Sequence, residues 1–385
     1  MNSPRLHALA IYLAIYALSA LAPCATALAE QPTEVVIVST QHFITDMPDG
    51  YTPAHLRALL EKAAPAVLAV EACSNADDPW LTAPYELTKV TRPWAIERKV
   101  PLVPIGWSEP NYSNQLGVMF NKFVASGNAA AYEQAEQQFQ KQSAELTMTC
   151  ASMNDDRSLN LWRNYHAKLH ELYGEETPWE AWNDKITANL LALCRKHPAK
   201  RIAVVFGGAH AYYFADRLAK EPNIRVIAAK EFFPLADDEI AAATRDGDYL
   251  QAMRLLNYFP GSLTPAQLTS LEQRLQPLQD FKQYQNDYQY YKARLLLHQN
   301  KPADALEALT PLADVQPSVL LDFDGVTSVR DAARLQIYFA IQGQGKTTAA
   351  IEHLRSLAND KTVSLSIRQT AEALLNANAT PATNR

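Results

Sequence analysis

Histidine and glutamate side chains stand at the ends of several apolar segments of this chain, and these residue types can activate water. Imidazole and carboxylate groups act as general bases, as general acids and as ligands of divalent metals. The residues of interest are His42 and Asp46 in TQHFITD, Glu71 in LAVEACSN, and Gly207, Gly208 and His210 in VVFGGAH. Whether they form one site depends on how the preceding segments are arranged in space.

Five segments are typical of β-strands that are covered on both faces, because each is a continuous apolar run. They span residues 34–40, 66–72, 100–107, 201–207 and 223–229, with helical patterns between them at 52–64, 85–99 and 211–221. Strands separated by helices predict an α/β fold with a mostly parallel sheet and right-handed crossovers. Ligands of such sheets bind beyond the carboxyl ends of the strands. We therefore expect the histidines and Glu71 to face one rim, together with Trp107 and Glu109 from the third strand.

Two further regions are predicted to be helical. A polar insert from Asn111 to Pro198 is expected to cap one side of the sheet. After Pro234 the strand pattern stops, and units at 246–258, 300–313 and 344–358 share a short turn, an alanine and an apolar ridge. These units resemble tetratricopeptide-type hairpins with irregular spacing. The predicted organisation is an α/β domain at 30–234, an all-α repeat-like domain at 235–375 and a disordered tail at 376–385.

The N-terminal residues have the pattern of a secretory signal peptide. Arg5 and His7 precede an apolar run at 8–22, and Ala27-Leu28-Ala29 offers a cleavage site after Ala29. Residues 1–29 are therefore predicted to be removed and the protein to be periplasmic or secreted. An uncleaved membrane anchor is the alternative.

Charge and cysteine content exclude several classes of function. The formal net charge is −6 and no run of Lys or Arg stands out, so no nucleic-acid partner is expected. Cys73, Cys150 and Cys194 would remain in the mature chain without a C-x-x-C pair, which argues against a zinc knuckle or a disulfide scaffold. One disulfide with one free thiol, or three buried thiols, are both compatible with the sequence.

Three other motifs are better explained by structure than by function. AIQGQGKT (340–347) satisfies a loose phosphate-loop pattern, but few residues and no strand follow it, so we expect a helix–turn–helix and no nucleotide. LLDFDGVTS (320–328) resembles a phosphatase motif whose downstream body is missing. His166 and His170 are four residues apart on a predicted helix, and we interpret them as part of a solvated face.

Glu71 is the hardest of the rim residues to explain by structure alone. A carboxylate on an apolar strand is costly to bury unless it is paired or coordinated. The two glycines before His210 suit a tight strand-to-helix turn with or without a ligand.

The segments VSTQH, PAVLAVEA and VVFGGAH together resemble the TraB/Tiki superfamily, which also contains erythromycin-esterase-like and ChaN-like haem-uptake proteins. Gly207 to His210 fits the family's G-x-x-H motif, and Glu71 lies where the family has its glutamate. Ser39 stands where glycine is usual in the first motif, and NDKITA (183–188) agrees with a further family motif at Asp184 and Ala188 but lacks its Arg and Met. The resemblance covers about residues 34–230.

The resemblance implies a hydrolase-like site, and with the signal-peptide pattern it predicts an exported hydrolase that acts on a peptide or small-molecule substrate. In one version His42, Glu71 and His210 hold a divalent metal such as zinc, manganese or cobalt; in the other His42 is a general base polarised by a carboxylate, without metal. His210 would bind the metal or stabilise the oxyanion, helped by the glycine amides. The expected supporting residues are Asp46, Asp184, Gly207 and Gly208.

Two alternatives to a hydrolase remain open at the level of sequence. The first is a non-catalytic protein that binds haem or a metal at the same rim. The second is a scaffold that recruits a protein partner through the helical repeats.

Overall fold

The computed structural model describes residues 31–42, 50–80, 83, 84, 86–245, 248, 256, 263–316 and 328–379. The predicted signal peptide, Asp46, most of the first repeat unit and all but the last residue of LLDFDGVTS lie outside these residues. Among the helices of the described part, none is both long and apolar enough to cross a membrane.

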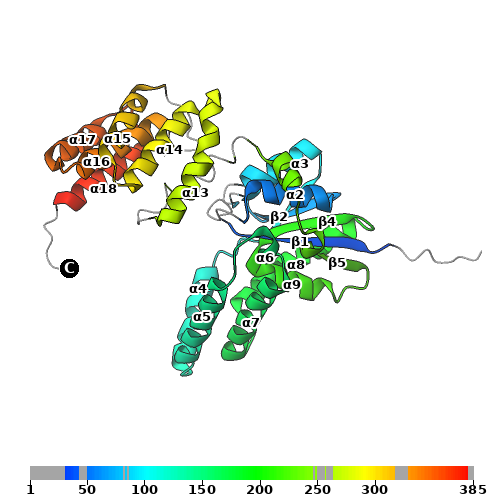
Figure 1. Ribbon diagram of the computed structural model, residues 1–385. Coiled ribbons are helices and arrows are strands. Elements are labelled where there is room, and N and C mark those ends of the chain that lie inside the picture. Colours follow the sequence, from blue (N-terminus) through cyan, green and yellow to red (C-terminus); the bar gives the residue numbers. More distant parts are fainter. Residues whose placement is uncertain are drawn as a thin grey trace, which may run out of the picture.

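A five-stranded parallel sheet forms the centre of the N-terminal part, which confirms the predicted α/β fold (Figure 1). Its strands follow the order β3-β2-β4-β1-β5. Their bounds are Thr33–Thr40 for β1, Val67–Cys73 for β2, Leu102–Gly106 for β3, Arg201–Gly207 for β4 and Ile224–Ala228 for β5. Each strand lies within two residues of its predicted segment, because continuous β-branched and apolar runs are the pattern of strands buried on both faces.

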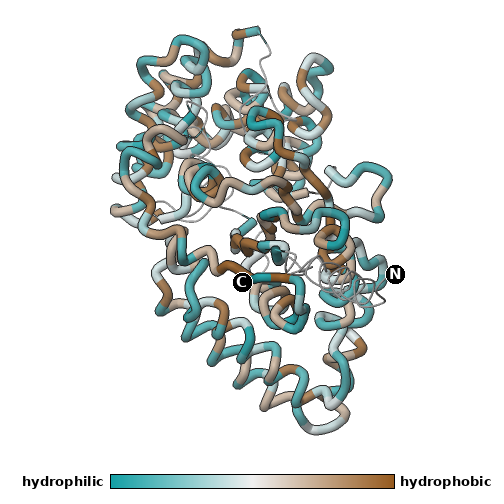
Figure 2. Tube along the Cα trace, turned by 90° about the vertical axis from the view of Figure 1, so that its right-hand side faces the viewer, coloured by the Kyte–Doolittle hydropathy of each residue, from teal (hydrophilic) through white to brown (hydrophobic). Residues whose placement is uncertain are grey.

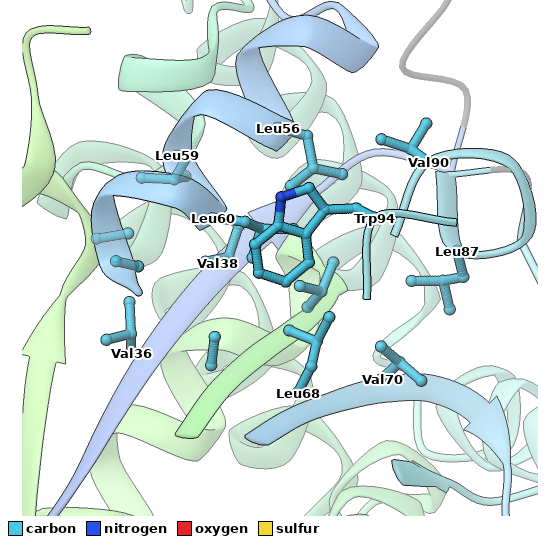
Figure 3. Close-up of a cluster of buried hydrophobic side chains, with 14 of the residues drawn as sticks. Val36, Val38, Leu56, Leu59, Leu60, Leu68, Val70, Leu87, Val90 and Trp94 are labelled. Atoms are coloured by element: carbon cyan, nitrogen blue, oxygen red, sulfur yellow. The ribbon is translucent and has the colours of Figure 1, made fainter. Parts of the chain in front are cut away.

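Helices cover both faces of this sheet, so alternate strand residues enter two separate cores. Val36 and Val38 of β1 face α2 (Pro53–Ala63) and α3 (Arg92–Arg98), where Trp94 is packed among leucines and valines (Figure 3). Val35 and Ile37 face the opposite way, toward α8 (Pro178–Lys196) and α9 (Gly208–Leu218). Figure 1 shows the two layers of helices on opposite sides of the strands.

The helices that follow β1 and β2 form largely where the sequence places them. Thr52 caps α2 through a capping box with His55, and Pro53 occupies the first turn as expected. The predicted helix at 85–99 is divided into a π-helical turn, η2 (Glu86–Thr91), and α3, with Pro93 in the first turn of α3. Proline is tolerated there because its missing N–H has no partner within the helix.

The predicted insert consists of five helices, α4 to α8, and lies between β3 and β4. The first four are α4 (Tyr112–Ala125), α5 (Ala129–Ala144), α6 (Cys150–Met153) and α7 (Asp156–Tyr173). In Figure 1 the helices α4, α5 and α7 extend away from the sheet. Along these and the other helices hydrophobic and hydrophilic residues alternate, as Figure 2 shows, which is the pattern of helices with one packed face.

The chain after β5 is helical, as predicted. A 3₁₀ turn, η3 (Ala229–Phe232), leads to α10 (Asp237–Ala243), which packs on α2 through Ile240 and Ala243. The remaining elements are α13 (Pro265–Leu275), η5 (Gln276–Asp280), η6 (Lys282–Tyr284), α14 (Gln285–His298), α15 (Pro302–Leu309), η7 (Thr310–Asp314), α16 (Val329–Gly343), α17 (Thr347–Asn359) and α18 (Leu365–Ala379). The helix α10 thus belongs by its packing with the α/β part, although the predicted boundary lies before it.

Successive helices of the C-terminal part pack as hairpins, α14 with α15 and α16 with α17. The alanines on which the repeat units align, Ala305 and Ala350, are both buried in this packing. The phosphate-loop-like segment is the turn between α16 and α17, so it joins two helices rather than a strand and a helix.

Two details of the chain differ from or refine the sequence analysis. Helix α18 continues to Ala379, four residues into the predicted disordered tail, and residues 380–385 lie outside the described part. Cys150 and Cys194 are buried as free thiols, and burial raises the pKa of both, that of Cys194 to about 11. The buried-thiol interpretation therefore holds for these two residues.

Candidate functional site

The carboxyl ends of β1, β2 and β4 bring His42, Glu71 and His210 together. These strands are neighbours in the sheet, and β1 and β4 are paired up to Thr40 and Gly207, so their ends are level. Oε1 of Glu71 lies 3.7 Å from Nε2 of His42 and 3.5 Å from Nε2 of His210. The three side chains that the sequence predicts at one rim thus lie together, with both histidines facing the same oxygen of Glu71.

Glu71 is held by the backbone of the neighbouring strand. The N–H of Gly207 donates a 2.6 Å hydrogen bond to its Oε2. The pairing of β2 with β3 shifts register between Val70 and Cys73, which places Glu71 in an irregular part of the strand. Burial raises the pKa of Glu71 to about 7, against the lowering effect of the His42 charge and of the Gly207 hydrogen bond. The carboxyl group can therefore exchange a proton near neutral pH.

His210 is a buried, neutral imidazole with a defined tautomer. It lies in the first turn of α9, because β4 runs directly into this helix at Gly208, three residues earlier than predicted. Its Nδ1 is 2.7 Å from Oδ1 of Asn183, whose amide nitrogen donates to the carbonyl of Trp179. This orientation makes Oδ1 the acceptor and His210 Nδ1 the donor, so Nε2 carries the lone pair. Burial, with the charges of His42 and His166, lowers the pKa of His210 to about 3.

His42 lies between two carboxylates. Its Nδ1 is 3.2 Å from Oε1 of Glu86, a fully buried residue of η2. The hydroxyl of Thr40 donates to the same oxygen at 3.2 Å. Burial disfavours the imidazolium ion of His42, but the hydrogen bond to Glu86 and the charges of Glu71 and Glu86 outweigh this effect and raise the pKa to about 9. At neutral pH His42 is therefore a cation that can donate a proton.

Sequence reasoning missed Glu86 and Asn183, although the sequence contains a signal for each. Glu86 precedes Val90 and Trp94 at intervals of four residues, so it belongs to the apolar stripe of its helical segment. Asn183 precedes Ile186, Thr187 and Leu190 on the buried side of α8 in the same way. A polar residue on an apolar helical stripe needs a buried partner, and here each partner is a site histidine.

The end of β1 is anchored by side chains where the neighbouring strand has already ended. The pairing of β1 with β5 stops at Ile37. Beyond it, Asn154 accepts the N–H of Ser39 at 2.7 Å and donates to its carbonyl at 3.3 Å, which replaces the missing strand. The hydroxyl of Tyr51 donates to the same carbonyl at 2.8 Å. These bonds fix the position from which His42 projects, although Ser39 stands where the family resemblance expects glycine.

The two glycines at the junction of β4 and α9 allow other groups to approach the backbone closely. A Cβ atom on Gly207 would lie 3.2 Å from Nε2 of His42, and one on Gly208 would lie 3.3 Å from Cε of Met153. The amide of Gly207 is already bonded to Glu71, so it is not available to a developing oxyanion as the resemblance suggested.

Asp184, a second expected supporting residue, lies apart from the three site residues. Its carboxylate accepts hydrogen bonds from Tyr213 at 2.7 Å and from Arg217 at 2.9 Å, both on α9. Successive residues of a helix point about 100° apart, so Asn183 can face His210 while its neighbour does not. Asp46 lies outside the described residues.

The other rim and histidine candidates have separate partners. The carbonyl of Trp107 accepts a hydrogen bond from the indole of Trp182, and Glu109 pairs with Lys185. His166 is buried, with Nδ1 2.9 Å from the hydroxyl of Tyr212, whereas His170 is exposed, with Nδ1 2.8 Å from Oε2 of Glu180. The predicted solvated face is therefore correct for His170 and wrong for His166, which is enclosed by aromatic rings that include Trp179.

The chemistry of the donor set suits a divalent cation. Both site histidines offer Nδ1 to an outer acceptor and turn Nε2 toward Glu71, as metal-binding histidines do. Ligand atoms about 2.1 Å from a tetrahedral metal are separated by about 3.4 Å, close to the 3.5 and 3.7 Å measured here. Over the described residues no three His, Cys, Asp or Glu side chains are already gathered as a metal centre.

No family model, curated protein or solved structure matches this chain. The site is therefore interpreted from its own geometry.

Proposed function

We propose that this protein is an exported hydrolase of peptide or ester bonds and that His42, Glu71 and His210 form its active site. The observation that supports the proposal best is the approach of both Nε2 atoms to one oxygen of Glu71. Three separate strand ends supply these groups, and packing alone gives no reason to gather them. The order of the motifs, with the resemblance to the TraB/Tiki superfamily, supports the same proposal.

In this proposal Glu71 is the general base. Its carboxylate takes a proton from a water molecule, whose oxygen then adds to the carbonyl carbon of the substrate. With a pKa of about 7, the group is ionised in a large share of molecules at neutral pH and still basic enough to accept the proton. The hydrogen bond from Gly207 holds Oε2, so Oε1 is the oxygen that faces the reacting water.

His42 is the general acid. Its Nε2 proton moves to the leaving nitrogen or oxygen as the bond to the carbonyl carbon breaks, and the proton held by Glu71 returns to His42 afterwards. Because Nε2 of His42 is 3.7 Å from Glu71, both groups can act at the same substrate carbonyl, Glu71 on the attacking water and His42 on the leaving atom. His210 remains neutral and accepts a hydrogen bond from the water, which orients it toward the substrate.

The same three residues would hold a divalent metal in the metal-dependent version. A bound metal would supply a Lewis acid for the substrate carbonyl. The outer partners of His42 and His210 would then keep each Nε2 lone pair directed at the cation.

The test combines activity and metal content. Purified protein is assayed on a panel of peptide and ester substrates, with and without zinc, manganese and cobalt, and its metal content is measured. We expect hydrolysis that falls at least about 100-fold in Glu71→Ala, with any stoichiometric metal lost. Glu34→Gln is the matched control, since Glu34 lies at the opposite end of β1 and pairs with Arg201 and Arg225.

Other results would overturn this proposal. Metal or haem bound stoichiometrically without turnover would indicate a binding protein. Unchanged activity in Glu71→Ala would remove the site assignment.

A further inference from the structure

A second buried carboxylate, unused in the chemistry proposed above, lies against the site. Glu86 has no exposed surface, and its Oε1 contacts both Nδ1 of His42 and the hydroxyl of Thr40. Its Oε2 is buried and has no hydrogen-bond partner among the described residues. Burying a carboxylate with one oxygen unsatisfied is costly. The contacts of its other oxygen with His42 and Thr40 are therefore the reason to expect a role for this residue.

We propose that Glu86 is a positioning residue that acts through His42 at the site of the proposed hydrolase. By accepting the Nδ1–H, Glu86 makes Nε2 the ring atom that faces Glu71 and the substrate. It also fixes the rotation of a ring whose side chain is 44% exposed and would otherwise turn freely. The orientation of His42 by Glu86 does not depend on the proposed function. Only the use of the oriented ring as a general acid or metal ligand rests on that proposal.

The local structure holds Glu86 rigidly enough for this task. The hydroxyl of Thr91 donates to the Glu86 carbonyl at 2.8 Å, which closes the π-helical turn. Leu87 and Val90 on the same turn are fully buried in the core beside α2. These contacts hold the turn that carries Glu86, and the carboxylate itself is fully buried beside His42.

The two site histidines differ in what holds them. His42 has a carboxylate at Nδ1, whereas His210 has the neutral amide of Asn183 at 2.7 Å. A carboxylate at this position makes the opposite ring nitrogen a better electron-pair donor than an amide does. The two histidines are thus held differently: a carboxylate orients the ring of His42, whereas a neutral amide orients that of His210.

The experiment compares Glu86→Gln with the wild-type protein in two measurements. Zinc affinity is measured by competition with a chromogenic chelator, and the Nδ1 proton of His42 is observed by ¹H–¹⁵N NMR in the metal-free protein. We expect zinc affinity to fall about 10- to 100-fold and the far-downfield signal of a carboxylate-bound Nδ1 proton to disappear. Glutamine is close to isosteric and removes an unsatisfied buried charge, so the variant is expected to fold.

The matched control is Glu180→Gln, because His170 and Glu180 form a second Nδ1–carboxylate contact, at 2.8 Å and away from the site. Glutamine preserves the capping box that Glu180 makes with Thr177, so this variant should bind zinc as the wild type does. Wild-type zinc affinity and an unchanged His42 signal in Glu86→Gln would overturn the inference.

The two measurements separate this inference from the proposed function. If the wild-type protein binds no zinc and hydrolyses nothing, the proposed function fails. The NMR signal still shows whether Glu86 accepts the Nδ1 proton of His42. Loss of the signal in Glu86→Gln supports the inference in that case, and persistence refutes it. Should the variant fail to fold, absence of a hydrogen-bonded Nδ1 proton on His42 in the wild-type protein would refute it as well.

Discussion

Replacing Glu71 with glutamine should stabilise the protein at alkaline pH while it removes the proposed activity. Burial raises the pKa of Glu71 from an ordinary value of 4.5 to about 7, despite the opposing effects of the His42 charge and the Gly207 N–H. The folded protein therefore holds this proton more tightly than the unfolded chain does. Glutamine imitates the protonated side chain and has no proton to lose.

The sign and size of the effect follow from these two pKa values. Below pH 4.5 the carboxyl group is protonated in both states, and the substitution should change little. Between pH 4.5 and about 7 only the unfolded chain loses the proton, so the stability of the wild-type protein falls as the pH rises. Above pH 7 the full penalty is present, and the difference in pKa corresponds to about 3 kcal/mol.

The assay is guanidinium-induced unfolding of the wild-type and variant proteins, followed by tryptophan fluorescence, at about pH 4, 6 and 8. We expect Glu71→Gln to be more stable by about 3 kcal/mol at the highest pH and equal at the lowest. Glu34→Gln is the control of opposite sign, because hydrogen bonds from Arg225 and Arg201 lower the pKa of Glu34. A Glu71→Gln protein that is less stable at pH 8, or a difference independent of pH, would refute the reasoning.

Three further substitutions test how the site is supported. Asn183→Ala leaves the buried Nδ1–H of His210 without an acceptor and should cost about 2 kcal/mol in chemical unfolding; no loss would show that water replaces the amide. Gly207→Ala places a methyl group 3.2 Å from Nε2 of His42, so we expect a large loss of activity and only a small loss of stability. Unchanged kinetics would contradict the geometry. Asn154→Ala removes the two hydrogen bonds to the backbone of Ser39 at the end of β1 and should lower the free energy of unfolding by about 1–3 kcal/mol. Equal unfolding midpoints for the variant and the wild type would contradict this prediction.

The sequence by itself determined the sheet and the three residues at its rim. Continuous apolar runs identify buried strands locally, and strands joined by helices leave parallel pairing as the natural arrangement. Parallel pairing then directs all carboxyl ends to one edge, so His42, Glu71 and His210 could be expected there before their distances were known. Each step needs only the residues of one segment and a general rule of sheet topology.

Only the tertiary structure decided which groups support these three residues. Glu86 and Asn183 lie far along the chain from the histidines that they contact, and their hydrogen bonds depend on how η2 and α8 pack against the sheet. Asp184 shows the limit of the sequence most clearly, because its neighbour Asn183 reaches the site whereas Asp184 pairs with Tyr213 and Arg217. Helix rotation separates these two neighbours, and packing against other elements sets that rotation. The pKa values of the site have the same origin, since burial and neighbouring charge exist only after the chain has folded.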